Sequence, residues 1–482
     1  MIAMTLPEIA VVVRGRVYDD SGDSSAIVSG PAFLDSRVVE LGGLFVALAG
    51  GRVDGHDFAR MAMAAGAAAV LGSRPLGLPM VVVEDPLVAL GRLAHHLVDH
   101  LPDLTVVALT GSQGKTSTKD LLARVLSDAG RTVATVGSLN NELGVPLTVL
   151  RAGPRTDYLV LEMGSRGIGH LRYLCEIVRP DVSLVLNVGK AHLGEFGTQA
   201  DIASAKAELV EALDPAGIAV LNADDALVRA MATRTSARVT SYGQRAGADL
   251  LIENLHVDDT GRPSFDLART GAREHVQLQL LGEHQAVNAA AAAAVATAVG
   301  VPLDRVARSL GEVSSTSRWR MEPHELAGGI TLINDAYNAN PDSMRAALKT
   351  LAAIGRGRSG PTRTIAVLGE MRELGESSPD EHDAVGRLVV RLDINQLVVV
   401  GEPARPMHLG ACHEGSWAEG SVFVRDNEEV FTWLQENLVA GDVVLFKASR
   451  AAELERVVDA MINEASTVAD GEVATEPKEA DR

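Results

Sequence analysis

Residues 106–130 carry their apolar side chains at two different spacings. Val106 to Leu109 form a short continuous apolar run, which predicts a buried strand. Apolar residues then recur at the spacing of one helix face until Gly130 supplies a stop, and they are Leu121, Leu122, Val125 and Leu126. The segment therefore predicts a strand, a glycine-containing turn and an amphipathic helix.

The same kind of reading along the chain predicts an α/β protein of three domains. Short strands and an Ala-rich helix over residues 57–71 indicate a small α/β domain at 1–102. Strands alternating with helices predict a doubly wound, mostly parallel sheet at 103–315 and a Rossmann-like domain at 316–464, although no G-x-G-x-x-G follows a strand. Residues 465–482 are acidic with few large apolar side chains, so we expect a disordered tail.

The turn "TGSQGKT" at 110–116 has the chemistry of a phosphate-binding loop. Backbone N–H groups at a helix N-terminus point towards an anion, and Gly111 and Gly114 allow it to approach closely. Lys115 can reach terminal phosphates, and the Thr116 hydroxyl can bind Mg²⁺. Leu109 stands where the strict P-loop pattern has glycine, so the loop is a shortened relative. We predict a nucleotide site.

Composition limits the partners of this site. The chain of 482 residues has 46% hydrophobic residues and a net charge of −19, which argues against nucleic-acid binding. The N-terminus lacks a basic leader, and the apolar tract near residue 290 is mostly alanine, so we expect neither a signal peptide nor membrane insertion. Two cysteines provide neither a disulfide framework nor a four-cysteine zinc site, and we expect a cytoplasmic location.

Several polar residues follow predicted strands or begin helices. Glu162 ends the strand "DYLVLEM" and could hold a second Mg²⁺, or simply end the strand. His192 follows another strand and could join the same metal or be an ordinary loop histidine. Lys206 lies beside the apolar face of a helix, where a solvated lysine is the simpler interpretation. Asn288 could bind a base edge or orient the start of its helix.

A dense polar run surrounds the predicted strand "GITLIND" near the start of the last domain. "SRWRMEPHE" and "INDAYNANPDSM" bring Arg320, Asp335, Asn338 and Asn340 close together in the sequence. Arg318 competes with Arg320 for any role in binding phosphate. Such a density of polar groups indicates a binding site rather than a turn alone.

Taken together, these stretches resemble the Mur ligase family of peptidoglycan synthesis, along nearly the whole chain and in the same order. The segments that carry the resemblance are "TGSQGKTSTKD", "NNELGVPLTVL", "LEMGS", "AHLGEFG", "AKAEL", "GEHQAVNAAAA" and "NDAYNANPDSM". "DAYNANPDSM" and "LGEMRELG" resemble most the branch that joins D-alanyl-D-alanine to UDP-N-acetylmuramoyl-tripeptide. The segment 35–58 is similar to the UDP-sugar-binding domain of that branch and of the preceding ligase.

The resemblance implies roles for individual residues. Lys115 and Thr116 would hold ATP phosphates and one Mg²⁺, with Glu162 and His192 on a second Mg²⁺, and Lys206 would be carbamylated near the metals. Arg320 would reach the γ-phosphate and Arg318 is the less favoured choice. The other implied contacts are to ATP, from Thr110, Gly111, Gly114, Ser117, Asn288, Asp335 and Asn338, and to the substrates, from Ser36, Arg37, Asn140, Asn338 and Asn340.

The implied reaction is an ATP-dependent ligation through an acyl phosphate, with small-molecule substrates and a monomeric enzyme. Alternatives are a ligase that adds the third residue, a ligase that adds glutamate to folate, and a nucleotide-binding regulatory subunit. The first would carry Asp-Asn-Pro-Arg in the last domain, and that tetrapeptide is absent. Two departures from the family stand out: Gln285 replaces an asparagine, and Ala448 replaces the glycine of "KGSR". Both are chemically mild.

Overall fold

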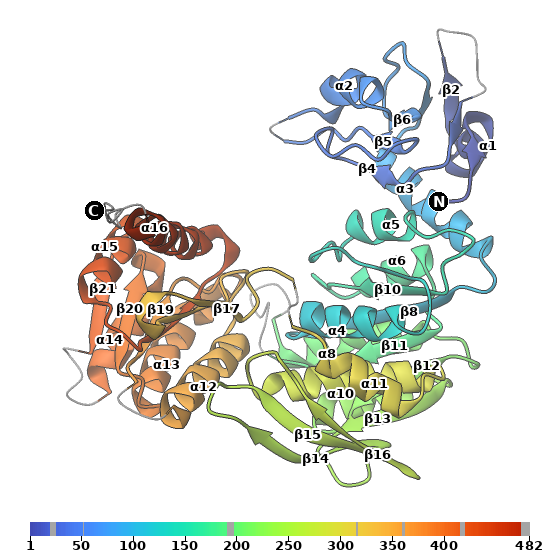
Figure 1. Ribbon diagram of the computed structural model, residues 1–482. Coiled ribbons are helices and arrows are strands. Elements are labelled where there is room, and N and C mark those ends of the chain that lie inside the picture. Colours follow the sequence, from blue (N-terminus) through green and yellow to red (C-terminus); the bar gives the residue numbers. More distant parts are fainter. Residues whose placement is uncertain are drawn as a thin grey trace, which may run out of the picture. The chain divides into compact units, whose positions relative to one another are not determined.

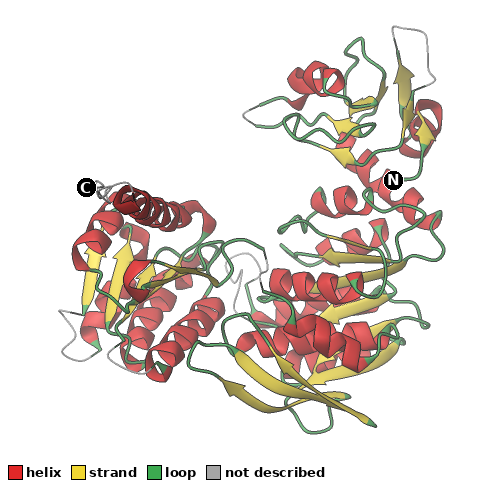
Figure 2. Ribbon diagram, viewed as in Figure 1, coloured by secondary structure: helices red, strands yellow, loops and turns green. Residues whose placement is uncertain are grey.

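The computed structural model describes residues 1–19, 26–51, 53–189, 197–314, 317–358, 362–414 and 420–473, with side chains described only to residue 465 in the last helix. The chain divides into two compact units. The first contains residues 1–187, 202–242 and 291–302, and the second contains 188–201, 243–290 and 303–482. Figures 1 and 2 show the elements of each unit.

The N-terminal part of the first unit is a five-stranded sheet in the order β2-β7-β6-β5-β4. All neighbouring strands are parallel except the β2–β7 pair. A two-stranded ribbon of β1 and β3 accompanies it. The strands are β1 (Met4–Thr5), β2 (Arg16–Tyr18), β3 (Ile27–Val28), β4 (Ala32–Phe33), β5 (Leu44–Val46), β6 (Ala69–Gly72) and β7 (Met80–Val82). The helices are α1 (Leu6–Val13), α2 (Ala59–Ala64) and α3 (Pro86–Asp99).

The prediction of a helix over residues 57–71 is wrong for the second half of that segment. A 3₁₀ turn at Gly55–Phe58 leads into α2, which is short, and Ala69–Gly72 forms the buried strand β6. Gly66 has φ +111°, a left-handed backbone conformation that ends the helix. Tertiary pairing of β6 between β5 and β7 thus overrides the helix propensity of the alanines.

The nucleotide-type sheet of the first unit is parallel, in the order β9-β10-β8-β11-β12-β13. The strands are β8 (Thr105–Thr110), β9 (Thr132–Ala134), β10 (Tyr158–Glu162), β11 (Val182–Val185), β12 (Ile218–Asn222) and β13 (Arg238–Gly243). The helices are α4 (Lys115–Ser127), α5 (Gly144–Val149), α6 (His170–Ile177), α8 (Gln199–Glu211) and α9 (Ala226–Ala230). A single apolar cluster includes α1 and α3 together with residues of β8, β10, α5 and α6. The N-terminal and central sheets of this unit therefore share a core.

The second unit contains an antiparallel meander that the sequence did not predict. It consists of β14 (Leu250–Val257), β15 (Pro263–Arg269) and β16 (Ala272–Gln277). The helices α10 (His284–Ala298) and α11 (Leu303–Gly311) follow in the sequence, and residues 291–298 of α10 belong to the first unit. Ala289–Ala294 of α10 are fully buried, as expected of a helix that is apolar on every side. Within the described residues, no helix has the length and apolar composition needed to cross a membrane.

The rest of the second unit is a six-stranded sheet in the order β17-β18-β22-β19-β20-β21, parallel except for β17. The strands are β17 (Glu322–Glu325), β18 (Thr331–Asn334), β19 (Thr364–Leu368), β20 (Gln396–Val400), β21 (Ser421–Val424) and β22 (Val443–Lys447). Two apolar clusters cover its faces, one with α12 (Pro341–Gly357), α13 (Ser378–Arg391) and α14 (Arg405–His413), the other with α15 (Asn427–Asn437) and α16 (Glu455–Val473) (Figure 1). This is the doubly wound layering that the sequence predicted.

The last helix extends into the segment expected to be disordered. α16 runs through Val473, although the expected tail begins at residue 465. Residues 474–482 of the expected tail lie outside the described residues.

Candidate functional site

The predicted phosphate loop lies between β8 and α4, at the carboxyl edge of the parallel sheet. Gly114 has φ +77° and forms the N-cap of α4, a position that disfavours any side chain. A Cβ on Gly111 would lie 2.8 Å from Cβ of Leu186, so glycine is needed there as well. The first turn of α4 contains Lys115, Thr116 and Ser117, and the structure therefore confirms the strand, turn and helix read from the sequence.

The shape of the loop is held by Asn187, a residue that the sequence analysis missed. Its Oδ1 accepts hydrogen bonds from the backbone N–H groups of Ser112 and Gln113, both at 3.0 Å. Its Nδ2 donates to the carbonyl of Gln113 at 3.2 Å. Asn187 follows β11, whose carboxyl end lies beside that of β8. Its position directly after a predicted strand was the signal that could have identified it.

The side chains of the loop remain close to it. Lys115 Nζ donates to the carbonyl of Gly111 at 2.7 Å, so the ammonium folds back over the turn. Thr116 and Ser117 are buried at the start of α4. Thr110 Oγ1 is buried and has no hydrogen-bond partner within the described residues. The loop thus combines backbone N–H groups, a cation and hydroxyls at one helix N-terminus, which is the chemistry of a phosphate site.

Glu162 lies at the end of β10, next to β8, and its carboxylate is only half satisfied. The side chain is 1% exposed, and Oε1 accepts from Asn140 Nδ2 at 2.7 Å. Oε2 is buried and has no hydrogen-bond partner among the described residues. A buried carboxylate oxygen without a donor is costly unless a cation binds it. Glu162 therefore fits the oxygen chemistry of a Mg²⁺ ligand.

A second layer of contacts supports Glu162. The backbone N–H of Glu162 donates to Thr135 Oγ1 at 3.0 Å. The carbonyl of Thr135 accepts from Lys119 Nζ at 2.8 Å, and this lysine is buried in α4 and forms an ion pair with Asp120. The helix that begins at the phosphate loop thereby fixes the backbone around the carboxylate. Sequence reasoning did not single out Lys119, because its spacing alone does not distinguish a buried lysine from a solvated one.

Lys206 is a buried lysine rather than a solvated one. The residue is 5% exposed, in α8, and no hydrogen bond or ion pair of its ammonium occurs among the described residues. Burial, and then the charge of Lys115, lower the pKa of Lys206 well below its ordinary value. Its neighbour Glu208 has a structural role, because its carboxylate accepts from the backbone N–H groups of Gly169 and Arg172 at the start of α6. The two charged residues of "AKAEL" thus have different environments.

The predicted metal site is not assembled as a whole within the described residues. His192 lies outside them. No group of three or more His, Cys, Asp and Glu side chains placed to hold a metal occurs in the described parts of the chain. Of the four predicted metal ligands, Thr116 lies in the first turn of α4, which follows β8, and Glu162 ends the neighbouring strand β10. Lys206 lies near Lys115.

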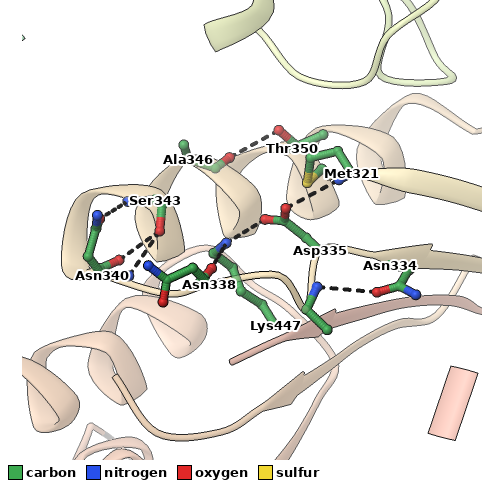
Figure 3. A network of polar contacts seen from close by, with 10 residues as sticks. Met321, Asn334, Asp335, Asn338, Asn340, Ser343, Ala346, Thr350 and Lys447 are labelled. Carbon is green, nitrogen blue, oxygen red and sulfur yellow. Dashed lines mark hydrogen bonds and ion pairs between the residues drawn. The ribbon is translucent and has the colours of Figure 1, made fainter. Parts of the chain in front are cut away.

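In the second unit, Asp335 and Lys447 form a buried ion pair at the carboxyl edge of the six-stranded sheet. Lys447 Nζ lies 2.5 Å from Asp335 Oδ2 and also donates to the carbonyl of Asn338 at 2.9 Å (Figure 3). Asp335 Oδ1 accepts from the backbone N–H of Met321 at 3.2 Å. Burial lowers the pKa of Lys447, and Asp335 opposes this effect. Sequence reasoning found Asp335 and missed Lys447, the last residue of β22.

The neighbouring asparagines of "NAN" are arranged differently from each other. Asn338 is exposed, and its backbone carbonyl holds Lys447. Asn340 is the N-cap of α12: its Oδ1 accepts from the backbone N–H of Ser343 at 2.8 Å, and Ser343 Oγ accepts from the backbone N–H of Asn340 at 3.0 Å (Figure 3). The Asn340 side chain thus has a structural partner, while its predicted contact with substrate stays a prediction.

Arg320 lies between two residues with strained backbones. Trp319 has φ +61° and Met321 has φ +50°, in the left-handed region that bulky residues rarely adopt. The strain is held by hydrogen bonds from the backbone N–H groups of Trp319 to Glu322 and of Met321 to Asp335. The Arg320 guanidinium lies 4.2 Å from the centre of the Tyr337 ring. Arg320 is thereby presented from a fixed segment of backbone, and its predicted contact with the γ-phosphate stays a prediction.

Asn288 pairs with the residue that departs from the family pattern. Its Nδ2 donates to Gln285 Oε1 at 3.0 Å, and both side chains are buried in α10. Beside them, burial lowers the pKa of His284 to about 4, and Lys447 contributes to the same direction while Asp335 opposes it. The other departure, Ala448, is buried, and a Cβ on Gly369 would lie 2.8 Å from its Cβ. A glycine in the facing loop accommodates the alanine.

Ser36 and Arg37 lie in the N-terminal part of the first unit. The Arg37 guanidinium is largely exposed and donates to both carboxylate oxygens of Asp35, at 2.9 and 2.7 Å. Hydrogen bonds from the side chain and then the backbone of Arg37 lower the pKa of Asp35 to about 2. Arg37 is thus oriented at the surface after β4, which leaves its predicted contact with a uridine diphosphate as a prediction.

A phosphate loop, a half-satisfied carboxylate and a separate doubly wound domain define a class of nucleotide-binding α/β proteins. Comparison with known proteins gives the family. Models described as "Mur ligase family, catalytic domain", "Mur ligase middle domain" and "Mur ligase, glutamate ligase domain" match residues 33–97, 109–296 and 319–450. The chain belongs to the Mur ligase family.

The relatives that it resembles share one name. It is 46% identical to the UDP-N-acetylmuramoyl-tripeptide–D-alanyl-D-alanine ligase of Mycobacterium tuberculosis, over 96% of this chain and 98% of the relative. The Escherichia coli enzyme of that name is 36% identical, over 96% and 99%.

Solved structures similar to this chain include two that are named MurF. The structure of MurF from Acinetobacter baumannii superposes with a TM-score of 0.84 at 31% identity, covering 96% of this chain and 99% of that one. MurF from Thermotoga maritima in complex with ADP gives a TM-score of 0.77 at 30% identity, covering 91% and 99%. The predicted three-domain α/β fold is therefore confirmed. Each matched family model also lies within one of the expected domains, whose limits stay a prediction.

Proposed function

We propose that the chain is an ATP-dependent ligase that joins D-alanyl-D-alanine to UDP-N-acetylmuramoyl-tripeptide. The observation that carries this proposal is the similarity, along nearly the full length of both chains, to enzymes with that name. The phosphate loop and Glu162 supply the local chemistry that such a reaction needs. The cytoplasmic location and monomeric state expected from the sequence stay predictions.

The reaction has two steps, activation of a carboxylate and formation of an amide. A carboxylate oxygen of the tripeptide attacks the γ-phosphorus of ATP, giving an acyl phosphate and ADP. The amine of the dipeptide then attacks the acyl carbon, phosphate leaves, and the amine loses a proton as the amide forms. The carboxylate, the ATP phosphates and the leaving phosphate are all anions, so the site must neutralise negative charge rather than supply a nucleophile.

The residues of the chain divide this task. The N–H groups of the loop and Lys115 would hold the phosphates. The contact of Arg320 with the γ-phosphate, implied by the family resemblance, is part of this proposal. Mg²⁺ held by Thr116 and Glu162 would neutralise phosphate charge when bound. Glu162 is oriented for this by Asn140 and by its backbone bond to Thr135. Asp335 and Asn288 are candidates for the ribose and adenine of the nucleotide.

The finer part of the proposal is that Lys206 carries a carbamate. The neutral amine is the form that reacts: its nitrogen bonds to the carbon of CO₂, and one proton is released. Burial beside Lys115 favours that neutral form, and the carbamate would replace a repelled cation by an anion near Lys115. With ¹³C-labelled bicarbonate, we expect a carbamate carbonyl signal in the wild-type NMR spectrum and none in Lys206→Ala. Full ligation without any incorporated label would contradict it.

The proposed function itself is tested by phosphate release. We expect release from ATP only when both the UDP-tripeptide and D-alanyl-D-alanine are present, with product identified by mass spectrometry. Steady release with neither substrate would favour the regulatory NTPase. Incorporation of a single amino acid into a UDP-dipeptide would favour the ligase for the third residue. That enzyme type is represented by a solved structure 21% identical to this chain, which establishes a common fold alone.

A further inference from the structure

An arginine and aromatic cluster of the second unit has no assigned role in the reaction described above. The guanidinium of Arg450 lies 4.4 Å from the centre of the Trp319 ring, and that of Arg318 lies 5.4 Å from it. The rings of Trp319 and Tyr337 are stacked, with centres 6.4 Å apart. Arg450 follows β22, at the same carboxyl edge as Asp335 and its partner Lys447. This edge is where parallel α/β sheets bind ligands.

Arg450 is fixed in place yet accessible. Its Nη1 forms an ion pair with Glu455, whose side chain is buried, while the arginine side chain is 47% exposed. The guanidinium also lies over the Trp319 ring, a contact that restricts the plane of the cation. Apart from the Glu455 pair, no hydrogen bond of this guanidinium occurs among the described residues. The group therefore presents an oriented set of N–H donors.

Trp319 supports the same conclusion from independent observations. Its backbone is in the left-handed region, and its N–H donates to Glu322 at 2.9 Å, so the ring is held at a cost in strain. The indole Nε1 is buried and has no hydrogen-bond partner within the described part of the chain. A strained aromatic residue with an unused buried donor is expected where a ligand completes the contacts.

We propose that Arg450, oriented by Trp319 and Glu455, binds the terminal carboxylate of the incoming D-alanyl-D-alanine. This inference rests on the proposed function and names a binding residue for its second substrate. A planar guanidinium matches a carboxylate through two parallel hydrogen bonds, and the aromatic rings offer apolar surface to the two small methyl groups. Because Glu455 already neutralises part of the local charge, the site suits a single anionic group better than a triphosphate.

The experiment compares two forms of the dipeptide, the free acid and its C-terminal amide, in the full-length enzyme with ATP and the UDP-tripeptide. We expect the wild type to have a KM about 10 to 100 times higher for the amide, as for loss of one hydrogen-bonded charge. Arg450→Ala should raise the KM of the acid by a similar factor and bind both forms equally. The KM values for ATP and for the UDP-tripeptide should remain nearly unchanged.

Two further variants make the test specific. Arg456→Ala is the matched control, because Arg456 also pairs with a glutamate, Glu453, and is 70% exposed without touching Trp319. Arg456→Ala should leave the ratio of the KM values for the amide and the free acid as it is in the wild type. Arg450→Lys retains the charge without the planar fork, and it should recover part of the preference for the acid if Arg450→Ala is poorly folded.

The outcomes separate this inference from the proposed function. If the KM for the amide divided by the KM for the free acid were the same in wild type and Arg450→Ala, the proposed role of Arg450 would be wrong. A rise in the KM of ATP with no change in that of the dipeptide would assign Arg450 to phosphate instead, and would overturn it as well. If the wild type ligates neither form of the dipeptide, the proposed function fails before any variant is considered.

Discussion

The buried charged groups at the carboxyl edges of the two parallel sheets differ in whether they have partners of opposite charge. At the edge of β8 and β10, Lys206 is buried near Lys115, and Glu162 retains a carboxylate oxygen without a donor among the described residues. At the edge of β18 and β22, the buried charges of Asp335 and Lys447 compensate each other within the chain. Among the described residues, the Glu162 carboxylate at the first edge is only half satisfied, whereas the two charges at the second edge are paired with each other.

This difference indicates that the first edge, at β8 and β10, needs charged ligands to balance its charges, whereas the second edge, at β18 and β22, does not. Phosphates and Mg²⁺ would supply the missing counter-charges at the first edge, so its residues are available for the reaction. The pair at the second edge instead fixes the position of backbone around Met321 and Asn338. We therefore expect substitutions at the first edge to affect mainly the reaction, and substitutions at the second to affect mainly folding.

The largest effect is expected from Lys447→Met, which leaves the Asp335 carboxylate buried without its cation. Breaking such a pair costs about 3–5 kcal/mol of unfolding free energy. All three tryptophans, Trp319, Trp417 and Trp433, belong to the second unit, so urea unfolding followed by their fluorescence reports on this unit. The double variant Lys447→Met/Asp335→Asn should recover most of the loss. A single variant as stable as wild type would mean that the pair is not buried in solution.

The second largest effect is a loss of kcat, and it is expected from Lys115→Ala at the edge of β8 and β10. Removing one charge-assisted contact to phosphate commonly raises the barrier by about 3–4 kcal/mol, which is two to three decades in kcat. Because the Lys115 ammonium donates to a backbone carbonyl of its own turn, that of Gly111, the melting temperature should change little. Comparable kcat values for variant and wild type would remove the loop from the mechanism, and a large loss of stability would contradict the contrast between the edges.

The two edges also differ in how far the sequence predicted them. The loop, Lys115 and Thr116 lie within one strand-turn-helix segment, and local spacing was sufficient to find them. Asn187 and Lys447 were missed because their partners lie 74 or more residues away in the sequence, and no local pattern reports such pairs. The positive φ of Trp319 was equally invisible, since tertiary contacts impose it against the preference of the residue.

For the fold, the parallel sheets were predictable because buried parallel strands are continuous apolar runs. The meander β14 to β16 was missed although β15 alternates buried and partly exposed positions, and in β14 a bulge between Glu253 and His256 interrupts the alternation. The end of α2 was missed for a different reason, because alanines of high helix propensity form strand β6.

A smaller effect, dependent on pH, is expected from His284 beside the paired edge. Its pKa in the folded protein is about 4, mainly because of burial, and about 6.5 when unfolded. The unfolded chain therefore binds more protons between these values, so stability is fully present above pH 6.5 and falls towards pH 4, by about 2–3 kcal/mol. His284→Gln should reduce this slope in urea unfolding at several pH values. An unchanged slope would assign the acid sensitivity to other groups.

The smallest effect concerns Asn340, for which helix capping and substrate binding make different predictions. Asn340→Ala removes the acceptor for the Ser343 N–H and should lower the unfolding free energy by about 1 kcal/mol. Asn340→Ser can still cap α12 but has a shorter side chain without an amide. If capping is the only role, Asn340→Ser retains both stability and KM for each substrate. If the amide also contacts a substrate, Asn340→Ser remains stable while one KM rises, and the paired edge then takes part directly in binding.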